Sequence, residues 1–174
     1  NPEAYHAAHP DIDPRFLFVN LGYNLRLTEV QAAIGLVQLP KLRGFVDIRR
    51  VNAARWKVAL APWTRYFDFQ RETPWGRSSW FGFSLVLKPA ATFSTAEIRK
   101  HLEQAGIETR PIICGNIARQ PGLQMWPHRV VGNLPHATNI MQRAFSIGNH
   151  QGIGTAEQDY VVDAIADFMA SRGL

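Results

Sequence analysis

Hydrophobic and polar residues recur with helical spacing over a long central stretch of the chain. From Thr28 onward, apolar residues return every three to four positions, which is typical of an amphipathic helix. Thr28 and Gln31 form a capping-box pair that marks the helix start, and Pro40 ends or kinks the helix because proline removes a donor and clashes with the preceding turn. The helical pattern then resumes and ends at Pro62, so we expect one long, bent helical element over residues 28–61.

Short runs rich in aromatic and branched residues follow this helical stretch and predict β-strands. They cover residues 65–69, 80–88, 107–113 and 144–147. Between the second and third runs, Ser94 and Glu97 form another capping-box pair, and the helix that they begin stops at Gly106, a good left-handed cap. The order strand, helix, strand predicts a compact α/β unit in this part of the chain.

Two further helices are expected near the C-terminal end. The first covers residues 135–143. The last follows a turn over residues 148–154, begins with the capping pair Thr155 and Gln158, and ends before Gly173. Its inward-facing residues are expected to be Val161, Val162, Ile165 and Phe168.

The first 20 residues contain three prolines and no regular pattern, which predicts an irregular arm. The apolar patch at residues 16–19 is expected to form a short strand or simply to pack. The chain begins with Asn-Pro-Glu rather than with methionine, so we expect it to be part of a longer protein. The elements together predict an α+β fold, in which helices cover a small sheet and the long bent helix precedes it.

Composition narrows the classes of function. The 174 residues are 46% hydrophobic, enough to bury a real core. The net charge is +5 and 15 of the 19 basic residues are Arg, which favours bidentate contacts to carboxylate or phosphate. No basic run is interleaved with aromatic residues, so nucleic-acid binding is not expected, and no apolar run is long enough to span a membrane. The single cysteine, Cys114, excludes an intrachain disulfide and fits a reducing cytoplasm.

The turn before the long helix is the first candidate site. Asn24 and Arg26 lie just before Thr28, where free amides and the positive end of the helix dipole favour anions. The alternative interpretation is structural: the turn satisfies the helix entry and Arg26 is solvated. The residues alone put this alternative first, although Gly22 would let the backbone approach a ligand or a partner chain closely.

The second candidate site is the long polar loop over residues 114–133. Long loops inside compact domains are more often functional than idle. The loop and the strand before it offer side chains that can bind hydroxyls and phosphates, namely Arg110, Asn116, Arg119, Gln120, His128 and Arg129. The alternative is a solvated loop whose Trp126 packs on the surface, and the residues alone do not decide between the two.

No motif supplies visible catalytic chemistry. The six histidines lack the paired helical spacing of a zinc site, and His101 is expected to face solvent or a partner. Cys114 is expected to be a small buried residue, because no His, Asn or Asp partner can be placed beside it. We find no glycine-rich phosphate loop, no serine elbow and no carboxylate pair, so no catalytic or metal-binding residue is expected in this chain.

Two longer stretches resemble a known family. GYNLRLTEVQAAIGLVQLPKL resembles the segment that follows the cofactor-lysine region in DegT/DnrJ/StrS-type nucleotide-sugar aminotransferases, which have the fold-type I, pyridoxal-phosphate-dependent fold. TRPIICGNIARQP, followed by HRVVG, is most similar to the subgroup of 3-dehydrases that act on 4-keto-6-deoxy nucleotide hexoses. The resemblance covers nearly all of residues 16–170, as the C-terminal part of such an enzyme.

The resemblance implies a homodimer in which Asn24 and Arg26 lie beside the phosphate of the partner subunit's pyridoxal or pyridoxamine phosphate. The residues that it implies for substrate binding are Arg110, Asn116, Arg119, His128 and Arg129. The catalytic Lys, which is His in the dehydrases, belongs to an N-terminal large domain outside this chain, so the isolated chain is expected to be inactive. The implied parts are an arm with a ligand-facing turn (1–27), a connecting helix (28–61) and an α+β small domain (62–174).

Three functions follow from the resemblance. The first is C3 dehydration of a nucleotide-linked 4-keto-6-deoxyhexose in deoxysugar or O-antigen biosynthesis. The second is transfer of an amino group to a keto-sugar nucleotide, and the third is a non-catalytic dimerisation or regulatory module of the same fold. Asn149 and His150 stand where the dehydrases tend to carry a bulkier aromatic turn, which leaves the subgroup open.

Overall fold

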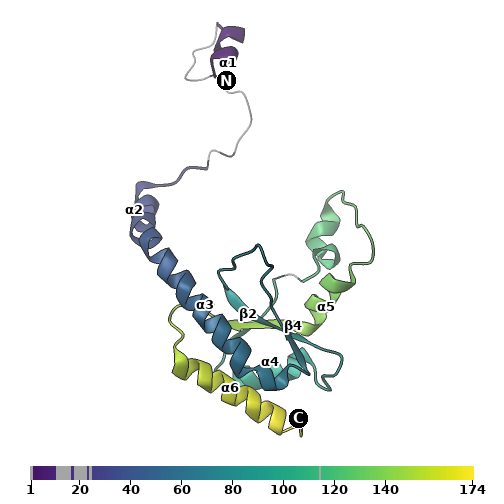
Figure 1. Cartoon of the computed structure of the whole chain (residues 1–174). Helices are drawn as coiled ribbons and strands as arrows, with labels where there is room; N and C mark the ends of the chain where they lie inside the picture. Colours follow the sequence, from purple (N-terminus) through teal and green to yellow (C-terminus); the bar gives the residue numbers. More distant parts are fainter. Residues whose placement is uncertain (1, 11–16, 18–22, 24, 114) are drawn as a thin grey trace. The chain divides into compact units, whose positions relative to one another are not determined.

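The computed structural model describes residues 2–10, 17, 23, 25–113 and 115–174. The chain divides into two compact units, Asn1–Pro40 and Lys41–Leu174. Among the described residues, every buried hydrophobic side chain belongs to the second unit, which also holds the sheet (Figure 1).

The first unit contains helix α1 (Pro2–Ala8) and helix α2 (Glu29–Gln38). Our prediction of an irregular segment is wrong for α1. Pro2 occupies its first position, where a missing N–H costs nothing, and Glu3 in the first turn is followed by three alanines, the best helix formers. Apart from Leu17, the apolar patch at residues 16–19 lies outside the described residues.

The capping box predicted at the start of α2 is confirmed. The Gln31 N–H donates to the Thr28 hydroxyl (3.4 Å), and the Thr28 N–H donates to Oε1 of Gln31 (2.8 Å). The helical run is interrupted at Pro40, as expected: α2 ends at Gln38. The chain then passes through a 3-10 turn, η2 (Leu39–Lys41), into helix α3 (Leu42–Ala59). Helix α2 contains no buried residue, and its exposed apolar residues include Val30, Ile34, Leu36 and Val37.

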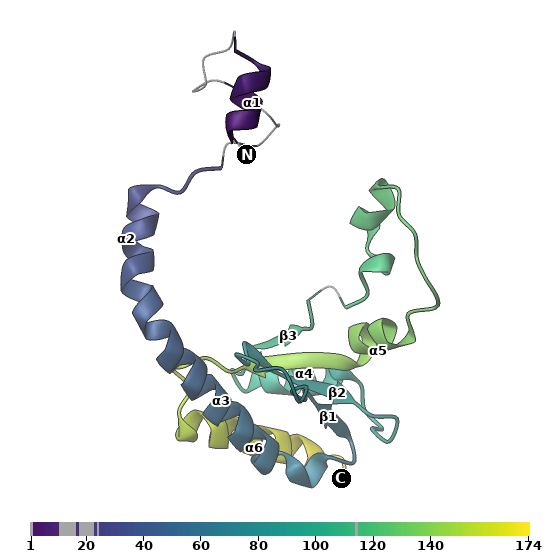
Figure 2. The same cartoon turned by 45° about the horizontal axis from the view of Figure 1, so that its top comes forward.

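A four-stranded antiparallel sheet forms the centre of the second unit (Figure 2). Its strands are β1 (Phe67–Phe69), β2 (Gly82–Leu87), β3 (Thr109–Pro111) and β4 (Ala144–Gly148). The four predicted strands are confirmed, with β1, β2 and β3 shorter than expected. Their spatial order is β1-β2-β4-β3, and β4 pairs antiparallel with both β2 and β3. β2 and β3 therefore run in the same direction and are joined by a helix, as the strand-helix-strand prediction expected, but β4 lies between them.

One face of the sheet carries the hydrophobic core. Alternate residues of β2 are buried, as expected for a strand with one covered face, and the register sets Phe83 opposite Ile147 and Leu85 opposite Phe145. The other face carries smaller and polar residues, with Ser84 opposite Ser146. The alternation therefore decides which face of the sheet is left for other contacts.

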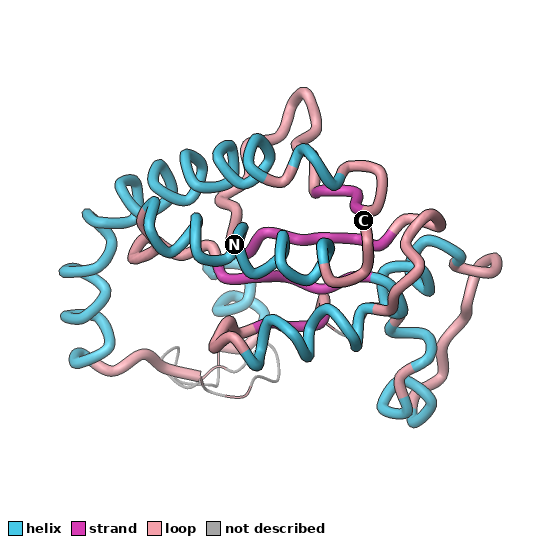
Figure 3. Tube along the Cα trace, turned by 90° about the horizontal axis from the view of Figure 1, so that it is seen from below, coloured by secondary structure: helices cyan, strands magenta, loops and turns pink. Residues whose placement is uncertain are grey.

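Helices α3, α4 (Thr95–Gln104) and α6 (Thr155–Ala170) cover the core face (Figures 2 and 3). The side chains that they bury include Ala53, Trp56, Ile98, Leu102, Ile165 and Phe168. Val161 and Val162, which we expected to be buried, are only partly so. The remaining helices are η3 (Ala61–Trp63), η4 (Ile117–Arg119), η5 (Pro121–Met125) and α5 (Pro135–Arg143), the last with the predicted bounds.

The start of α4 follows its prediction, whereas the start of α6 does not. The Ser94 N–H donates to Oε2 of Glu97 at 2.7 Å, which completes the expected capping box. At α6 the cap is Gly154, whose N–H donates to Oε2 of Glu157 at 2.9 Å. Gln158, the expected capping partner, is instead buried and donates to the backbone oxygen of Asn52 (3.3 Å), so packing against α3 takes precedence over the local motif.

Asn149 joins three parts of the second unit. Its side chain is 1% exposed, and its Nδ2 donates to the backbone oxygens of Arg49 (3.0 Å) and Trp80 (2.9 Å). Its Oδ1 accepts a hydrogen bond from the indole N–H of Trp56 at 3.3 Å. Asn149 therefore connects α3, the entry to β2 and the turn after β4, a packing role that its sequence position did not indicate.

His101 corrects another expectation. Its ring is partly buried, with Nε2 3.0 Å from the backbone oxygen of Ala164 and the ring 5.4 Å from that of Phe168. His101 thus belongs to the contact between α4 and α6, and does not face solvent or a partner.

Candidate functional site

The predicted loop over residues 114–133 connects β3 to α5 and stands away from the sheet (Figure 1). Its described part contains η4 and η5, which are tied together by a hydrogen bond from the side-chain amide of Gln124 to the backbone oxygen of Ala118 (3.2 Å). The loop therefore has local helical structure of its own and is not an extended connection.

The base of this loop is anchored on α5. Gly115 has a φ of +55°, and a Cβ there would lie 2.4 Å from the Cβ of Met141, so only glycine fits. Asn116 is 4% exposed; its Nδ2 donates to the Thr138 hydroxyl (3.0 Å) and its Oδ1 accepts from the Ala118 N–H (3.1 Å). Both ends of the Asn116 amide are thus used by the protein itself.

The basic side chains of the loop are exposed. Arg119 ends η4, and His128 and Arg129 follow η5. In the part of the chain that the structure describes, neither Arg119 nor Arg129 makes an ion pair or a side-chain hydrogen bond. Nδ1 of His128 lies 2.8 Å from the backbone oxygen of Trp126, which holds the imidazole beside the end of η5. These three side chains are therefore available to an anionic ligand.

A pocket of ≈ 370 Å³ lies against the two 3-10 segments. Its lining residues are Ile117, Gln120, Gly122, Leu123 and Trp126, and we call it the Trp126 pocket. The indole of Trp126 is part of the wall yet 69% exposed, contrary to the alternative in which it packs on the surface.

Arg110 lies apart from the loop residues. It projects from β3, where its Nε and one terminal nitrogen are each 2.8 Å from Oε1 of Glu108, and both side chains are exposed. Arg110 lines a different pocket, of ≈ 220 Å³, which shares no residue with the Trp126 pocket. Its other lining residues are Phe81, Gly82, Glu108, Ser146, Ile147 and Gly148.

Of the turn before α2, Asn24 and Gly22 lie outside the described residues. Arg26 is described and exposed, three positions before the first residue of α2. Thr28 and Gln31 satisfy each other at the helix start, so the capping does not require Arg26. A guanidinium beside a helix N-terminus suits a phosphate group, the part of pyridoxal phosphate that this segment could bind. The residue type and the sequence position of Arg26 are therefore compatible with a phosphate ligand.

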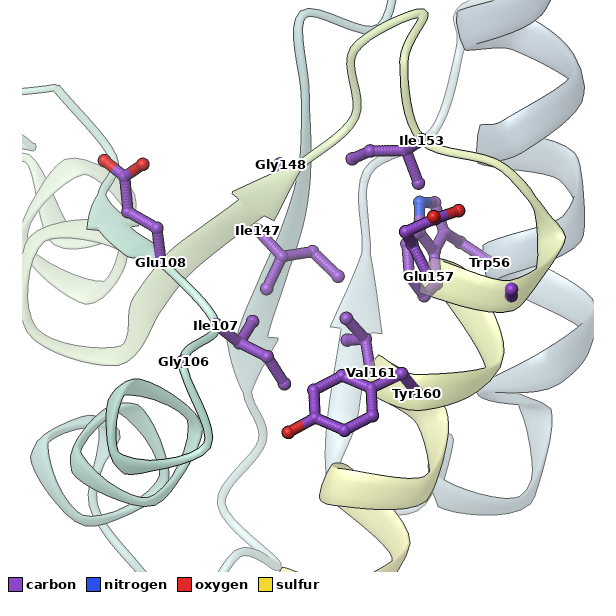
Figure 4. Close-up of a pocket in the computed structure, with 11 residues that line it drawn as sticks. Trp56, Gly106, Ile107, Glu108, Ile147, Gly148, Ile153, Glu157, Tyr160 and Val161 are labelled. Atoms are coloured by element: carbon purple, nitrogen blue, oxygen red, sulfur yellow. The ribbon is translucent and has the colours of Figure 1, made fainter.

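Sequence reasoning missed an apolar pocket of ≈ 470 Å³ between the end of β4 and α6 (Figure 4). Ile107, Ile147 and Val161 form its apolar walls, whereas the carboxylate of Glu108 points away from them. The Tyr160 hydroxyl donates to the backbone oxygen of Ala105 at 2.8 Å, across the gap between α6 and α4. Residues from four separated segments form this pocket, so no local motif could have indicated it.

Among the described residues, no group of three or more His, Cys, Asp or Glu side chains is placed to hold a metal ion. Within the same residues, no helix has the length and hydrophobicity needed to cross a membrane.

The sheet, its covering helices and the basic loop define a small α+β unit. Residues 4–166 match the model of the DegT/DnrJ/EryC1/StrS aminotransferase family, and the chain therefore belongs to this family. This confirms the resemblance found in the sequence.

Two curated relatives are similar over most of the chain. It is 41% identical over 162 residues to the GDP-4-keto-6-deoxy-D-mannose 3-dehydratase of Yersinia pseudotuberculosis, covering 90% of this chain and 40% of that protein. It is 37% identical over 156 residues to the lipopolysaccharide biosynthesis protein RfbH of Salmonella typhimurium, covering 90% of this chain and 36% of that protein. The chain thus spans about two fifths of the length of these relatives.

A solved structure shares the fold. The Escherichia coli GDP-4-keto-6-deoxy-D-mannose-3-dehydratase with bound hydrated PLP superposes with a TM-score of 0.80 at 36% identity, covering 87% of this chain and 39% of that one. The predicted α+β class and the resemblance to 3-dehydrases are confirmed.

Proposed function

We propose that this chain is the C-terminal small domain of a fold-type I enzyme, dependent on pyridoxal or pyridoxamine phosphate, that removes the C3 hydroxyl of a nucleotide-linked 4-keto-6-deoxyhexose. The observation that carries this proposal is the 41% identity to a 3-dehydratase over 90% of the chain. Because the chain spans about two fifths of that relative, the catalytic base and most of the cofactor site belong to the rest of the enzyme.

The proposed parts of the chain are the arm and turn (1–27), the connecting helical segment (28–61) and the small domain (62–174). The core of the second unit supports an independently packed small domain. The exposed apolar residues of α2 support a contact with the rest of the enzyme or with a second subunit, since large uncovered apolar patches are rare on monomers.

Arg26 and Asn24 are proposed to contact the cofactor phosphate of the partner subunit in a homodimer. The position of Arg26 before the N-terminus of α2 supports this, because the guanidinium and the helix amides would act on the same anion. When bound, the cofactor supplies an electron sink for loss of the C3 hydroxyl. The role of these two residues is to hold its phosphate.

The nucleotide-sugar diphosphate is proposed to bind to Arg119, His128 and Arg129. A separate part of the same substrate is proposed to bind to Arg110. The exposure of all four side chains supports direct contact. For Asn116 we propose a positioning role, because its amide already bonds Thr138 and Ala118 and so holds the loop against α5.

The cofactor contact is tested by Arg26→Ala in the complete protein. Loss of a charged hydrogen bond costs about 1.5–3 kcal/mol, so the dissociation constant of pyridoxamine phosphate should rise about 10- to 150-fold in an absorbance titration. Arg43→Ala is the matched control, since Arg43 is an exposed arginine within α3. An unchanged constant for Arg26→Ala, or an equal change in both variants, contradicts the contact.

The reaction is tested by product analysis. Incubation of the complete protein with a 4-keto-6-deoxyhexose nucleotide should give a product that has lost the C3 oxygen, detected by mass spectrometry. A product in which nitrogen replaces the keto oxygen would establish amino transfer, the alternative that the family description favours. Formation of neither product would support the non-catalytic module.

A further inference from the structure

We propose that the Trp126 pocket binds the base of the nucleotide, with the indole of Trp126 as its stacking surface. The inference rests on the proposed function, because it assumes a nucleotide-linked substrate. It goes beyond that function by assigning the base to a particular surface of this chain.

The pocket is an open depression with room for a planar ring. Its ≈ 370 Å³ lies within the range of about 300–1,000 Å³ that is usual for small-molecule sites. Gly122 forms part of the wall, and a Cβ built there would meet no atom within 4 Å, so open space lies above its backbone. A base could therefore approach the backbone at Gly122 in the same pocket that the indole of Trp126 lines.

Trp126 is held by its backbone rather than by core packing. Its N–H donates to the backbone oxygen of Leu123 at 3.1 Å, and its own backbone oxygen lies 2.8 Å from Nδ1 of His128. The side chain is nevertheless 69% exposed. An uncovered indole on an ordered backbone offers a large π-face to a ligand, and base–aromatic stacking needs no particular base sequence.

The charge around the pocket favours an anionic ligand over a protein segment. Arg119 lies between Ile117 and Gln120 in sequence, and both of these line the pocket. Residues 114–133 contain two Arg and one His but no Asp or Glu. An apolar protein partner would desolvate these cations without compensation, whereas the diphosphate of a nucleotide pairs with guanidinium groups. An aromatic face beside cations is the combination that a nucleoside diphosphate requires.

Binding of guanosine diphosphate to the complete protein tests the site by calorimetry, without any turnover. Trp126→Ala should raise its dissociation constant about 5- to 150-fold, which corresponds to about 1–3 kcal/mol for one stacked base. Trp126→Phe should keep most of the affinity. Trp75→Ala is the matched control, because Trp75 is 88% exposed but lies outside the loop, and it should leave the constant unchanged.

Binding of inorganic diphosphate, which has no base, distinguishes the contribution of base stacking from that of the basic side chains. Trp126→Ala should leave diphosphate binding unchanged, whereas Arg119→Ala should weaken diphosphate and guanosine diphosphate alike. Gly122→Leu should fill the pocket and weaken guanosine diphosphate without removing the indole, since the position is open and no positive φ is required.

Three results would overturn the proposal. The first is unchanged binding of guanosine diphosphate in Trp126→Ala. The second is an equal loss of inorganic diphosphate binding in Trp126→Ala, which would mean that Trp126 supports the diphosphate contacts and not the base. The third is a lower oligomer mass of Trp126→Ala with an unchanged affinity for guanosine diphosphate, which would mean that the Trp126 pocket is a contact surface between proteins. Nucleotide binding that depends on Trp126 in a protein without dehydratase activity would keep the site and refute only the proposed reaction.

Discussion

Helices α2 and α4 share a length of 10 residues and begin with the same capping-box motif, Thr28 with Gln31 in one and Ser94 with Glu97 in the other. Their surroundings differ. Leu102 on the apolar stripe of α4 is 0% exposed against the sheet and α6, whereas Ile34 on the stripe of α2 is 59% exposed, and α2 has no buried residue.

The difference separates two contributions to helix formation. A capping box acts over three residues and decides where a helix begins, whatever lies beside it. Most of the stability of a helix in a protein comes from packing of its apolar face, which needs a second element. α4 has that element within the second unit. We propose that α2 finds it in the rest of the enzyme.

The largest expected effect compares the two apolar stripes. Leu102→Ala should destabilise the chain by about 2–5 kcal/mol, because it removes buried methyl groups and leaves a cavity. Ile34→Ala should change the free energy of unfolding by less than about 0.5 kcal/mol, as is usual for exposed positions. Urea denaturation of the 174-residue chain measures both.

Equal costs for the two substitutions would contradict this comparison. Making the same two substitutions in the complete protein extends the comparison. If α2 is covered there, Ile34→Ala should become destabilising, while the cost of Leu102→Ala should stay the same.

An intermediate effect is expected for the two caps. Ser94→Ala should lower the free energy of unfolding by about 1 kcal/mol, the usual cost of a lost N-cap. Thr28→Ala should leave the denaturation midpoint unchanged and reduce only the helical signal in circular dichroism, because α2 lies outside the unit that holds the core. A shifted midpoint for Thr28→Ala would show that α2 unfolds together with the core.

The smallest effect is a pH dependence that only one of the two capping boxes can have. The backbone N–H of Ser94, then its hydroxyl, and then Arg172 donate to Glu97 and lower its pKa from 4.5 to about 2. A lowered pKa in the folded state means that this stabilisation is complete above about pH 4.5 and is lost as the pH falls toward 2. Gln31, in the equivalent position of α2, does not titrate.

Glu97→Gln should therefore reduce the loss of stability between about pH 4.5 and pH 2, measured as the shift of the urea midpoint. Gln31→Ala is the control and should leave that pH dependence as it is. An unchanged slope in Glu97→Gln would mean that other carboxylates carry the acid sensitivity.

The candidate site was predictable only in part. The basic residues of the loop could be found from composition and loop length, and they are exposed as a binding role requires. The burial of Asn116 could not, because it depends on Thr138, 22 positions away on α5. The separation of Arg110 from the Trp126 pocket likewise depends on where the loop leaves β3.

By itself, the sequence determined the features whose interactions span only a few residues: the capping boxes of α2 and α4, the interruption at Pro40, and the bounds of α5. Only the tertiary structure decided that Asn149 connects to Trp56, 93 positions away, and that Gln158 leaves its expected cap for Asn52, 106 positions away. Short-range motifs carry their own partners in the sequence. A buried polar group forms a hydrogen bond with a partner that the packed core brings close. The free energy cost of burying that group without a hydrogen bond is larger than the stabilisation that the local motif would contribute.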